Sequence, residues 1–196
     1  DYEIYLQNQK LEKNKIIPNS EYIVHLADSP WGGHDLVTEN FKPEVSKKEY
    51  CEKINIFFDK VEKFYNKKIL VVAHPKHKKE DNVYYDRNFI FGETEQLIKY
   101  SSGVICHFSG AINFAIIHHK PILFFLSKKW TNHRYLGTNT LYYSENISKK
   151  IEIIEDNEKP NFFYNKDIYD NYCKKFILNE RNHLSIAKVI SDNLFT

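Results

Sequence analysis

The sequence predicts an α/β fold, a Rossmann-like doubly wound parallel sheet with helices on both faces. Two observations predict it. Short unbroken apolar runs alternate with segments of helical spacing, and the connections between them are short. Unbroken apolar runs are typical of parallel strands, because helices cover both faces of a parallel sheet. With 196 residues, 42% of them hydrophobic, the chain is long enough for one compact domain, residues 1–196.

The first strand is predicted at residues 22–27, between two segments rich in turn-forming residues. A helix is predicted to begin at Ser46, because Glu49 three residues later completes a capping box. The apolar positions of this helix recur at helical spacing, and they are Tyr50, Ile54, Phe57, Phe58, Val61 and Phe64. The next strand runs through "KKILVVAHP" and stops at Pro75.

The alternation continues through the middle of the chain. Strands are predicted at residues 88–92, 103–108 and 120–126, and helices at 93–102 and 109–119. Right-handed crossovers between such parallel strands produce a doubly wound sheet. The last third predicts a helix within 128–147, a strand within 149–155 and two helices within 165–195.

Composition narrows the classes of function. The chain has 28 Lys and Arg against 26 Asp and Glu, and this near-neutral balance argues against a nucleic-acid partner. The three separate cysteines, Cys51, Cys106 and Cys173, fit neither a disulfide framework nor a zinc motif, so we expect a reducing, cytoplasmic location. The longest apolar run, "PILFFL", is far too short for a transmembrane segment, which leaves peripheral association with the inner face of a membrane.

The chain opens at Asp1 and contains no methionine. We therefore expect it to be part of a longer protein, with an N-terminal domain missing from this sequence.

Three predicted strands end in residues suited to binding. These ends are Ala73-His74-Pro75, Ile90-Phe91-Gly92 and His107-Phe108-Ser109. In open α/β sheets, ligands bind in the crevice beyond the carboxyl ends of the strands. We therefore expect the three ends to meet on one rim if the strands are neighbours.

The segment Ser109-Gly110-Ala111 is predicted to open a helix and to bind an anion. Serine is a good N-cap, glycine lets a ligand approach the backbone, and the helix dipole favours negative charge. Two alternatives stay open: Ser109 caps only its own helix, and alternation along the strand turns His107 into the core.

The stretch "VVAHPKHKK" favours the anion site. His74, held by the rigid Pro75, is placed to donate a hydrogen bond or a positive charge to a phosphate oxygen. Lys76 and His77 add positive potential nearby, whereas Lys78 and Lys79 read as part of a solvated basic loop.

Residues 69–126 resemble the C-terminal half of GT-B glycosyltransferases, especially bacterial sialyltransferase-like and capsule or lipooligosaccharide transferases. In those families a His-Pro motif and, further along, a Ser/Thr motif opening a helix both touch the phosphate of a nucleotide-sugar donor. Here His74-Pro75 and Ser109 match these motifs. The segment "CHFSGAINFAIIHHKPIL" is also similar to the phosphate-binding signature of UDP-sugar epimerases, including Lys120-Pro121.

The resemblance implies a metal-independent enzyme, the donor-binding half of a two-domain protein. It implies a CMP- or UDP-linked sugar as donor and a glycan or glycolipid as acceptor, with no further cofactor. The phosphate would contact His74, Lys76 and the amides of residues 109–111. The base and ribose would lie near Ile90, Phe91, Gly92 and His107.

An inverting transferase also needs a base near the acceptor hydroxyl. The loop "ADSPWGGHD" offers Asp28, His34 and Asp35, and Trp31 could stack on a sugar. In the alternative interpretation, this loop is only a turn with an Asp cap and a buried Trp. Other hypotheses are a nucleotide-sugar epimerase or hydrolase, a non-catalytic nucleotide-binding GT-B module, and a flavodoxin-like or receiver domain.

Overall fold

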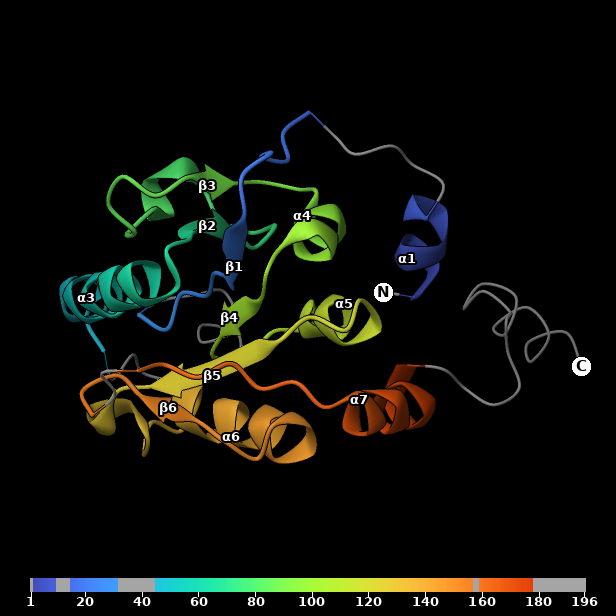
Figure 1. Cartoon of the computed structure of the whole chain (residues 1–196). Coiled ribbons are helices and arrows are strands. Elements are labelled where there is room, and N and C mark those ends of the chain that lie inside the picture. Colours follow the sequence, from blue (N-terminus) through green and yellow to red (C-terminus); the bar gives the residue numbers. More distant parts are fainter. Residues whose placement is uncertain (1, 10–14, 32–44, 157–158, 178–196) are drawn as a thin grey trace, which may run out of the picture.

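The protein is described by a computed structural model that covers residues 2–9, 15–31, 45–156 and 159–177. Its strands are β1 (Tyr22–Leu26), β2 (Lys68–Val72), β3 (Phe89–Ile90), β4 (Val104–Cys106), β5 (Ile122–Leu126) and β6 (Glu152–Ile153). They form one six-stranded sheet in the order β3-β2-β1-β4-β5-β6, and every pairing is parallel (Figure 1). This is the strand order of the Rossmann fold, with the reversal between β1 and β4. The predicted fold class is confirmed.

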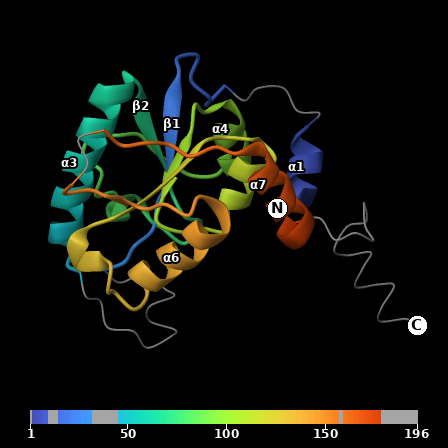
Figure 2. The same ribbon diagram turned by 60° about the horizontal axis from the view of Figure 1, so that its bottom comes forward.

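Helices cover both faces of the sheet (Figure 2). The main ones are α3 (Lys47–Tyr65), α4 (Thr94–Tyr100), α5 (Ile112–Ile117), α6 (Leu136–Ile147) and α7 (Lys166–Tyr172). A short N-terminal helix, α1 (Tyr2–Asn8), packs against α4. The long helix α3 lies on one face, and α4 and α5 lie on the other, as a doubly wound sheet requires.

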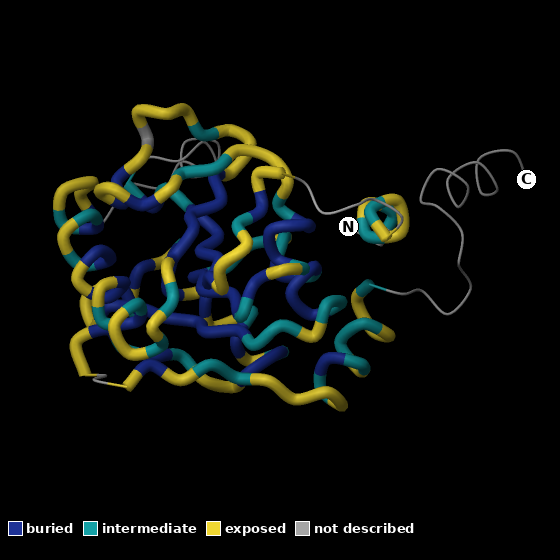
Figure 3. Tube along the Cα trace, turned by 45° about the horizontal axis from the view of Figure 1, so that its top comes forward, coloured by how far each residue is buried: buried dark blue, intermediate teal, exposed yellow. Residues whose placement is uncertain are grey.

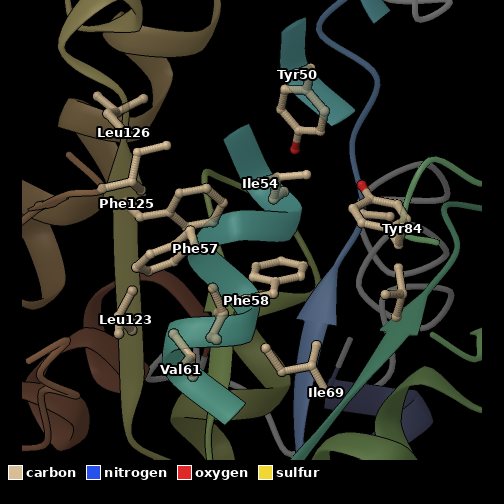
Figure 4. Packing of buried hydrophobic residues seen from close by; sticks show 14 of the residues in the cluster. Tyr50, Ile54, Phe57, Phe58, Val61, Ile69, Tyr84, Leu123, Phe125 and Leu126 are labelled. Carbon is tan, nitrogen blue, oxygen red and sulfur yellow. The ribbon is translucent and has the colours of Figure 1, made fainter. Parts of the chain in front are cut away.

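The strands alternate between two apolar clusters, and Figure 3 shows them as the buried centre of the molecule. In β4, for example, Ile105 packs on the α3 side, whereas Val104 and Cys106 pack on the α4–α5 side. Figure 4 shows the α3 side, where aromatic residues of the helix meet Phe125 of β5. All five residues of β1 and of β5 are buried, which explains the unbroken apolar run of β5 and the apolar run of β1, where His25 is the one polar residue.

Helix α3 begins where the sequence predicts. Ser46 is the N-cap, and its hydroxyl accepts a hydrogen bond from the Glu49 amide at 3.1 Å. The helix ends at Asn66, which adopts a left-handed conformation with φ of 52°. One predicted inward position is wrong, because Phe64 is 49% exposed and packs edge-on against Tyr65 at the end of the helix.

Two other expectations need correction. The helix after β4 begins at Ile112, not at Ser109, because residues 109–111 form a turn that precedes it. Helix α1 was not predicted by any pattern in the sequence. In the tail, α7 continues into a wider helical turn at Cys173–Ile177, and the second predicted helix falls outside the described residues.

Candidate functional site

The candidate site lies along the edge where the strands end. Because all six strands are parallel, their carboxyl ends share one edge of the sheet. His74 follows β2 and Ser109 follows β4, and only β1 lies between these strands. Adjacent strands are about 4.8 Å apart, so two spacings place the strand ends about 10 Å from each other. His74 and Ser109 therefore flank the reversal of strand order, where Rossmann-like sheets bind ligands.

The turn after β2 is tied to the end of β1 by His77. The Nδ1 atom of His77 accepts from the backbone amide of His74 at 3.3 Å. Its other ring nitrogen, Nε2, lies 2.7 Å from the Ser29 hydroxyl and carries the hydrogen in the neutral ring. His77 also stacks on Phe89 of β3, so one imidazole joins the ends of three strands.

The ring of His74 is exposed and has a defined tautomer. Its Nδ1 accepts from the Lys76 amide at 3.2 Å, so the neutral ring carries its hydrogen on Nε2. A donor at Nε2 is what contact with a phosphate oxygen requires. The side chain of Lys76 is exposed beside it.

Several polar groups of the turn at residues 109–111 form hydrogen bonds within the turn or to the residues that follow it. The Ser109 hydroxyl accepts from the Ala111 amide at 3.2 Å, and the Ser109 carbonyl accepts from Ile112 at 3.1 Å. The Gly110 carbonyl accepts from Asn113 at 3.2 Å. The amide of Ala111 is thus engaged within the turn, but Ser109 does not cap helix α5, whose N-cap is Ala111 and has no side-chain cap. Gly110 is exposed, and a Cβ added there would meet no atom within 4 Å.

Asp28 lies two residues after the end of β1 and belongs to a hydrogen-bonded row of three side chains. Its Oδ1 is 3.0 Å from the Tyr50 hydroxyl, and that hydroxyl is 3.1 Å from His107 Nε2. His107 Nδ1 in turn donates to the Phe125 carbonyl at 2.8 Å. The second carboxyl oxygen of Asp28, Oδ2, is buried and has no hydrogen-bond partner in the described part of the chain.

Burial shifts the pKa values of Asp28 and His107 in opposite directions. It raises the pKa of Asp28 to about 7, although the hydrogen bond from Tyr50 opposes the change. Burial also lowers the pKa of His107 to about 3, against the opposing effect of its bond to Phe125. At neutral pH His107 is therefore uncharged, and Asp28 is close to the midpoint of its titration.

His107 is a core histidine. It is fully buried, and both ring nitrogens have partners inside the protein. The prediction that His107 contacts a base or ribose is not supported by this environment, and alternation along the strand is the reason. His25 of β1 is similarly arranged, with Nδ1 on the Ile105 carbonyl and Nε2 3.4 Å from the Tyr84 hydroxyl.

The other predicted residues are spread along the same edge. Phe91 and Gly92 follow the outermost strand β3, and Gly92 adopts a φ of 73°, which only glycine takes without strain. The Ile90 carbonyl is occupied by the Ala73 amide. Trp31 is half-buried and packs on Tyr50, with its ring centroid 5.0 Å away. His34 and Asp35 lie outside the described residues, as does most of the loop that carries them.

Two residues of the site were missed from the sequence. Tyr50 was predicted only as an apolar position of its helix and Tyr84 was not singled out, yet their hydroxyl groups are turned toward one another in Figure 4. The Tyr50 hydroxyl contacts Asp28, and the Tyr84 hydroxyl lies 3.4 Å from His25 Nε2. A buried tyrosine normally forms a hydrogen bond through its hydroxyl, so the sequence could have indicated that these two residues have polar partners. It could not identify the partners, because they belong to other elements.

Among the described residues, no group of three or more His, Cys, Asp or Glu side chains is placed to hold a metal ion. None of the helices in the described ranges is both long and apolar enough to cross a bilayer.

Comparison with protein-family models finds no match to this chain, and comparison with curated proteins finds none either. What the structure establishes is the class of fold, a parallel Rossmann-like α/β sheet.

Proposed function

We propose that this chain is the donor-binding half of a metal-independent GT-B glycosyltransferase. It would transfer a sugar from a CMP- or UDP-linked donor to a surface polysaccharide or glycolipid, at the cytoplasmic face of the membrane. One observation carries the proposal. His74-Pro75 and Ser109-Gly110, the two motifs of the resemblance, follow the strands β2 and β4 on either side of the switch point.

The chemistry expected of these residues is the stabilisation of a departing phosphate. Negative charge grows on the phosphate as the bond to the sugar breaks, so donors aimed at it lower the barrier to transfer. His74 supplies an N–H at Nε2, and the open backbone at Gly110 lets an anion approach. Lys76 adds positive charge on the same side. Proton transfer from the acceptor hydroxyl is left to another group, for which Asp35 and His34 are the sequence candidates.

The direct test is calorimetry of the chain with CMP, UDP and GDP. Binding of CMP or UDP supports the proposal, and failure of all three to bind refutes it. A product assay then separates the enzymes. Release of nucleotide that requires an added acceptor indicates transfer, whereas conversion of the donor alone indicates an epimerase or hydrolase.

A substitution at Gly110 should leave the stability of the fold unchanged. A Cβ at this position meets no atom within 4 Å, and the backbone has no positive φ, so Gly110→Ala should fold as stably as the wild type. If a phosphate approaches this backbone, the added methyl group should weaken nucleotide binding at least tenfold. If the affinity measured by calorimetry and the melting temperature are both unchanged, the phosphate does not bind at this turn.

His74→Ala tests the other side of the switch point. The ring is exposed, so its loss should leave the melting temperature nearly unchanged. Loss of a charge-assisted or neutral hydrogen bond to phosphate should weaken binding about tenfold. A variant that fails to fold would instead assign His74 a structural role.

A further inference from the structure

The loop that carries His74 crosses from β2 to β3 without an α-helix. Residues 73–88, all of which the structure describes, contain only a short 3₁₀ turn at Lys79–Asp81. Parallel strands are usually joined through a helix that packs on the sheet. Here Val83 and Tyr84 of the loop pack instead into the apolar cluster on the α3 side, where Figure 4 shows Tyr84 beside the helix. Contacts with another element must therefore hold this loop in place.

Side chains of α3 hold the loop by its backbone. Asn55 Nδ2 donates to the Val83 carbonyl at 2.7 Å, and the Cys51 thiol donates to the same carbonyl at 3.0 Å. Nearer the start of the helix, Lys47 Nζ donates to the Glu80 carbonyl at 2.9 Å. These three donors are spaced four residues apart and so form one stripe along α3. Because they bind carbonyl groups, they fix the path of the loop backbone itself.

Asn55 is the centre of this stripe. It is fully buried, where an unpaired amide would be costly. Its Nδ2 also donates to the Cys51 carbonyl at 2.7 Å, and its Oδ1 accepts from Arg87 Nη1 at 2.8 Å. A guanidinium can only donate and a carbonyl can only accept, so these partners determine the orientation of the amide. Arg87, at the far end of the loop, also pairs with Asp59 at 2.5 Å and Glu62 at 3.0 Å.

The loop connects this anchor with His74 through its own turns. The His77 amide donates to the His74 carbonyl at 2.8 Å, and the Asn82 amide closes the 3₁₀ turn. The Asn82 side chain then accepts from the Tyr84 amide at 2.9 Å. A shift of the segment that α3 anchors would therefore change the orientation of the His74 ring.

We propose that Asn55 and Cys51 are positioning residues of the candidate site: by binding the Val83 carbonyl they fix the loop that begins at His74, and they thereby orient the Nε2 hydrogen of His74 toward the phosphate. The phosphate in this statement rests on the proposed function. The effect on the His74 ring does not, because it requires no nucleotide.

The first experiment records the nitrogen spectrum of His74 without nucleotide. The Lys76 amide donates to Nδ1, so the neutral ring should carry its hydrogen on Nε2. Asn55→Asp keeps the size of the side chain and an acceptor for Arg87, but it replaces the donor to the Val83 carbonyl with a second acceptor. The fraction of His74 with hydrogen on Nδ1 should rise about fivefold, the factor that one ordinary hydrogen bond supplies. An unchanged spectrum in the folded variant would refute the positioning role.

The second experiment asks whether Asn55 acts through His74. Asn55→Asp should weaken the binding of CMP or UDP about fivefold in calorimetry. In the His74→Ala background, Asn55→Asp should cost no further affinity, because the ring that Asn55 positions is already absent. A merely structural role would weaken binding by the same factor in both backgrounds, and that result would overturn the proposal.

Cys51 provides a second variant if Asn55→Asp does not fold. Cys51→Ala removes one donor to the Val83 carbonyl from a half-buried position, so the protein should fold. Because a thiol is a weak donor, the His74 spectrum and the nucleotide affinity should each change about twofold. Cys51→Ser restores a donor and should recover both values. The proposal fails if Cys51→Ala changes neither value.

Lys53→Met is the matched control on the same helix. The Lys53 ammonium group contacts the Ser127 hydroxyl at 3.1 Å and the Glu155 carboxylate at 2.6 Å, and neither group belongs to the loop. This variant should lower the melting temperature but leave the His74 spectrum and the nucleotide affinity unchanged. Changes as large as those of Asn55→Asp would show that any loss of stability has the same effect, and would refute the positioning role.

The outcomes also separate the two proposals. If neither CMP nor UDP binds the wild type, the proposed function is wrong, and the His74 spectrum still decides the positioning role. If a nucleotide binds and Asn55→Asp changes neither the spectrum nor the affinity, the positioning role is wrong and the proposed function stands.

Discussion

Two carboxyl groups at the same edge of the sheet have opposite environments. Glu155, just after β6, is saturated with donors: Oε1 contacts Lys53 Nζ at 2.6 Å and the Ser127 hydroxyl, and Oε2 contacts the Lys128 amide at 3.0 Å. Asp28, just after β1, has one donor on Oδ1 and none on Oδ2 within the described residues. Both carboxyl oxygens of Glu155 therefore have a hydrogen-bond donor, whereas one oxygen of Asp28 has none among the described residues.

The ionisation of the two groups follows from this difference. Burial raises the pKa of Glu155, but the hydrogen bonds from Lys53, Ser127 and Lys128 outweigh it and lower the pKa to about 2. At Asp28 burial prevails and raises the pKa to about 7. A carboxylate with a full set of donors fastens β6 to the neighbouring elements, whereas the Asp28 carboxyl keeps one buried acceptor that has no partner among the described residues.

The largest effect is expected from Asp28→Asn. Because folding raises the pKa of Asp28 from 3.8 to about 7, its contribution to stability is present at low pH and lost as pH rises through the folded value. At 1.36 kcal/mol per unit, the wild type should lose up to about 4 kcal/mol relative to Asp28→Asn between about pH 4 and pH 8. Denaturant unfolding of both proteins across this range measures the difference. Parallel pH profiles would show that Asp28 titrates normally.

Glu155→Gln should show the opposite dependence on pH and a smaller effect. Folding lowers the pKa of Glu155, so its stabilisation is present above the unfolded value and disappears as pH falls toward about 2. Since Glu155 is partly exposed, solvent screening reduces the expected loss at pH 7 to about 1–2 kcal/mol. Chemical denaturation at neutral and acid pH provides the measurement.

The same variant is the matched control for the ligand experiments. Glu155→Gln changes a carboxyl group on the same sheet edge and should leave nucleotide affinity unchanged. A loss of affinity as large as that expected of His74→Ala would contradict this expectation.

The sheet was predictable because its determinants are local. Every strand and crossover helix of the sheet has its own apolar run or helical spacing, and Ser46 marks the start of α3 by its capping contact. The strand order, in contrast, depends on which runs pair. The position of Ser109 ahead of its helix depends on a turn geometry that a Ser-Gly pair does not specify.

The candidate site was only partly predictable for the same reason. The sequence indicated His74, Ser109 and Asp28, since each follows an apolar run. It did not connect Asp28 to Tyr50, because the partner is 22 residues away on a helix whose spacing assigns that tyrosine to the core. For His107 the sequence left two interpretations: alternation along the strand places it in the core, and its position near the strand end places it at the site. Only its contacts with Tyr50 and Phe125 decide for the core.

The smallest effect concerns Ser29, which follows Asp28 and tests how firmly this half of the edge is held. Its hydroxyl contacts His77 Nε2 at 2.7 Å, and His77 Nδ1 accepts from the His74 amide. Ser29→Ala should therefore lower the unfolding free energy by about 1 kcal/mol and weaken nucleotide binding about threefold through a looser His74 turn. A double-mutant cycle with His77→Phe, which keeps an aromatic ring on Phe89, isolates the contact. Strictly additive effects would mean that the ends of β1 and β2 are held independently. The Ser29–His77 contact would then not join neighbouring elements in the way that the Glu155 carboxylate does.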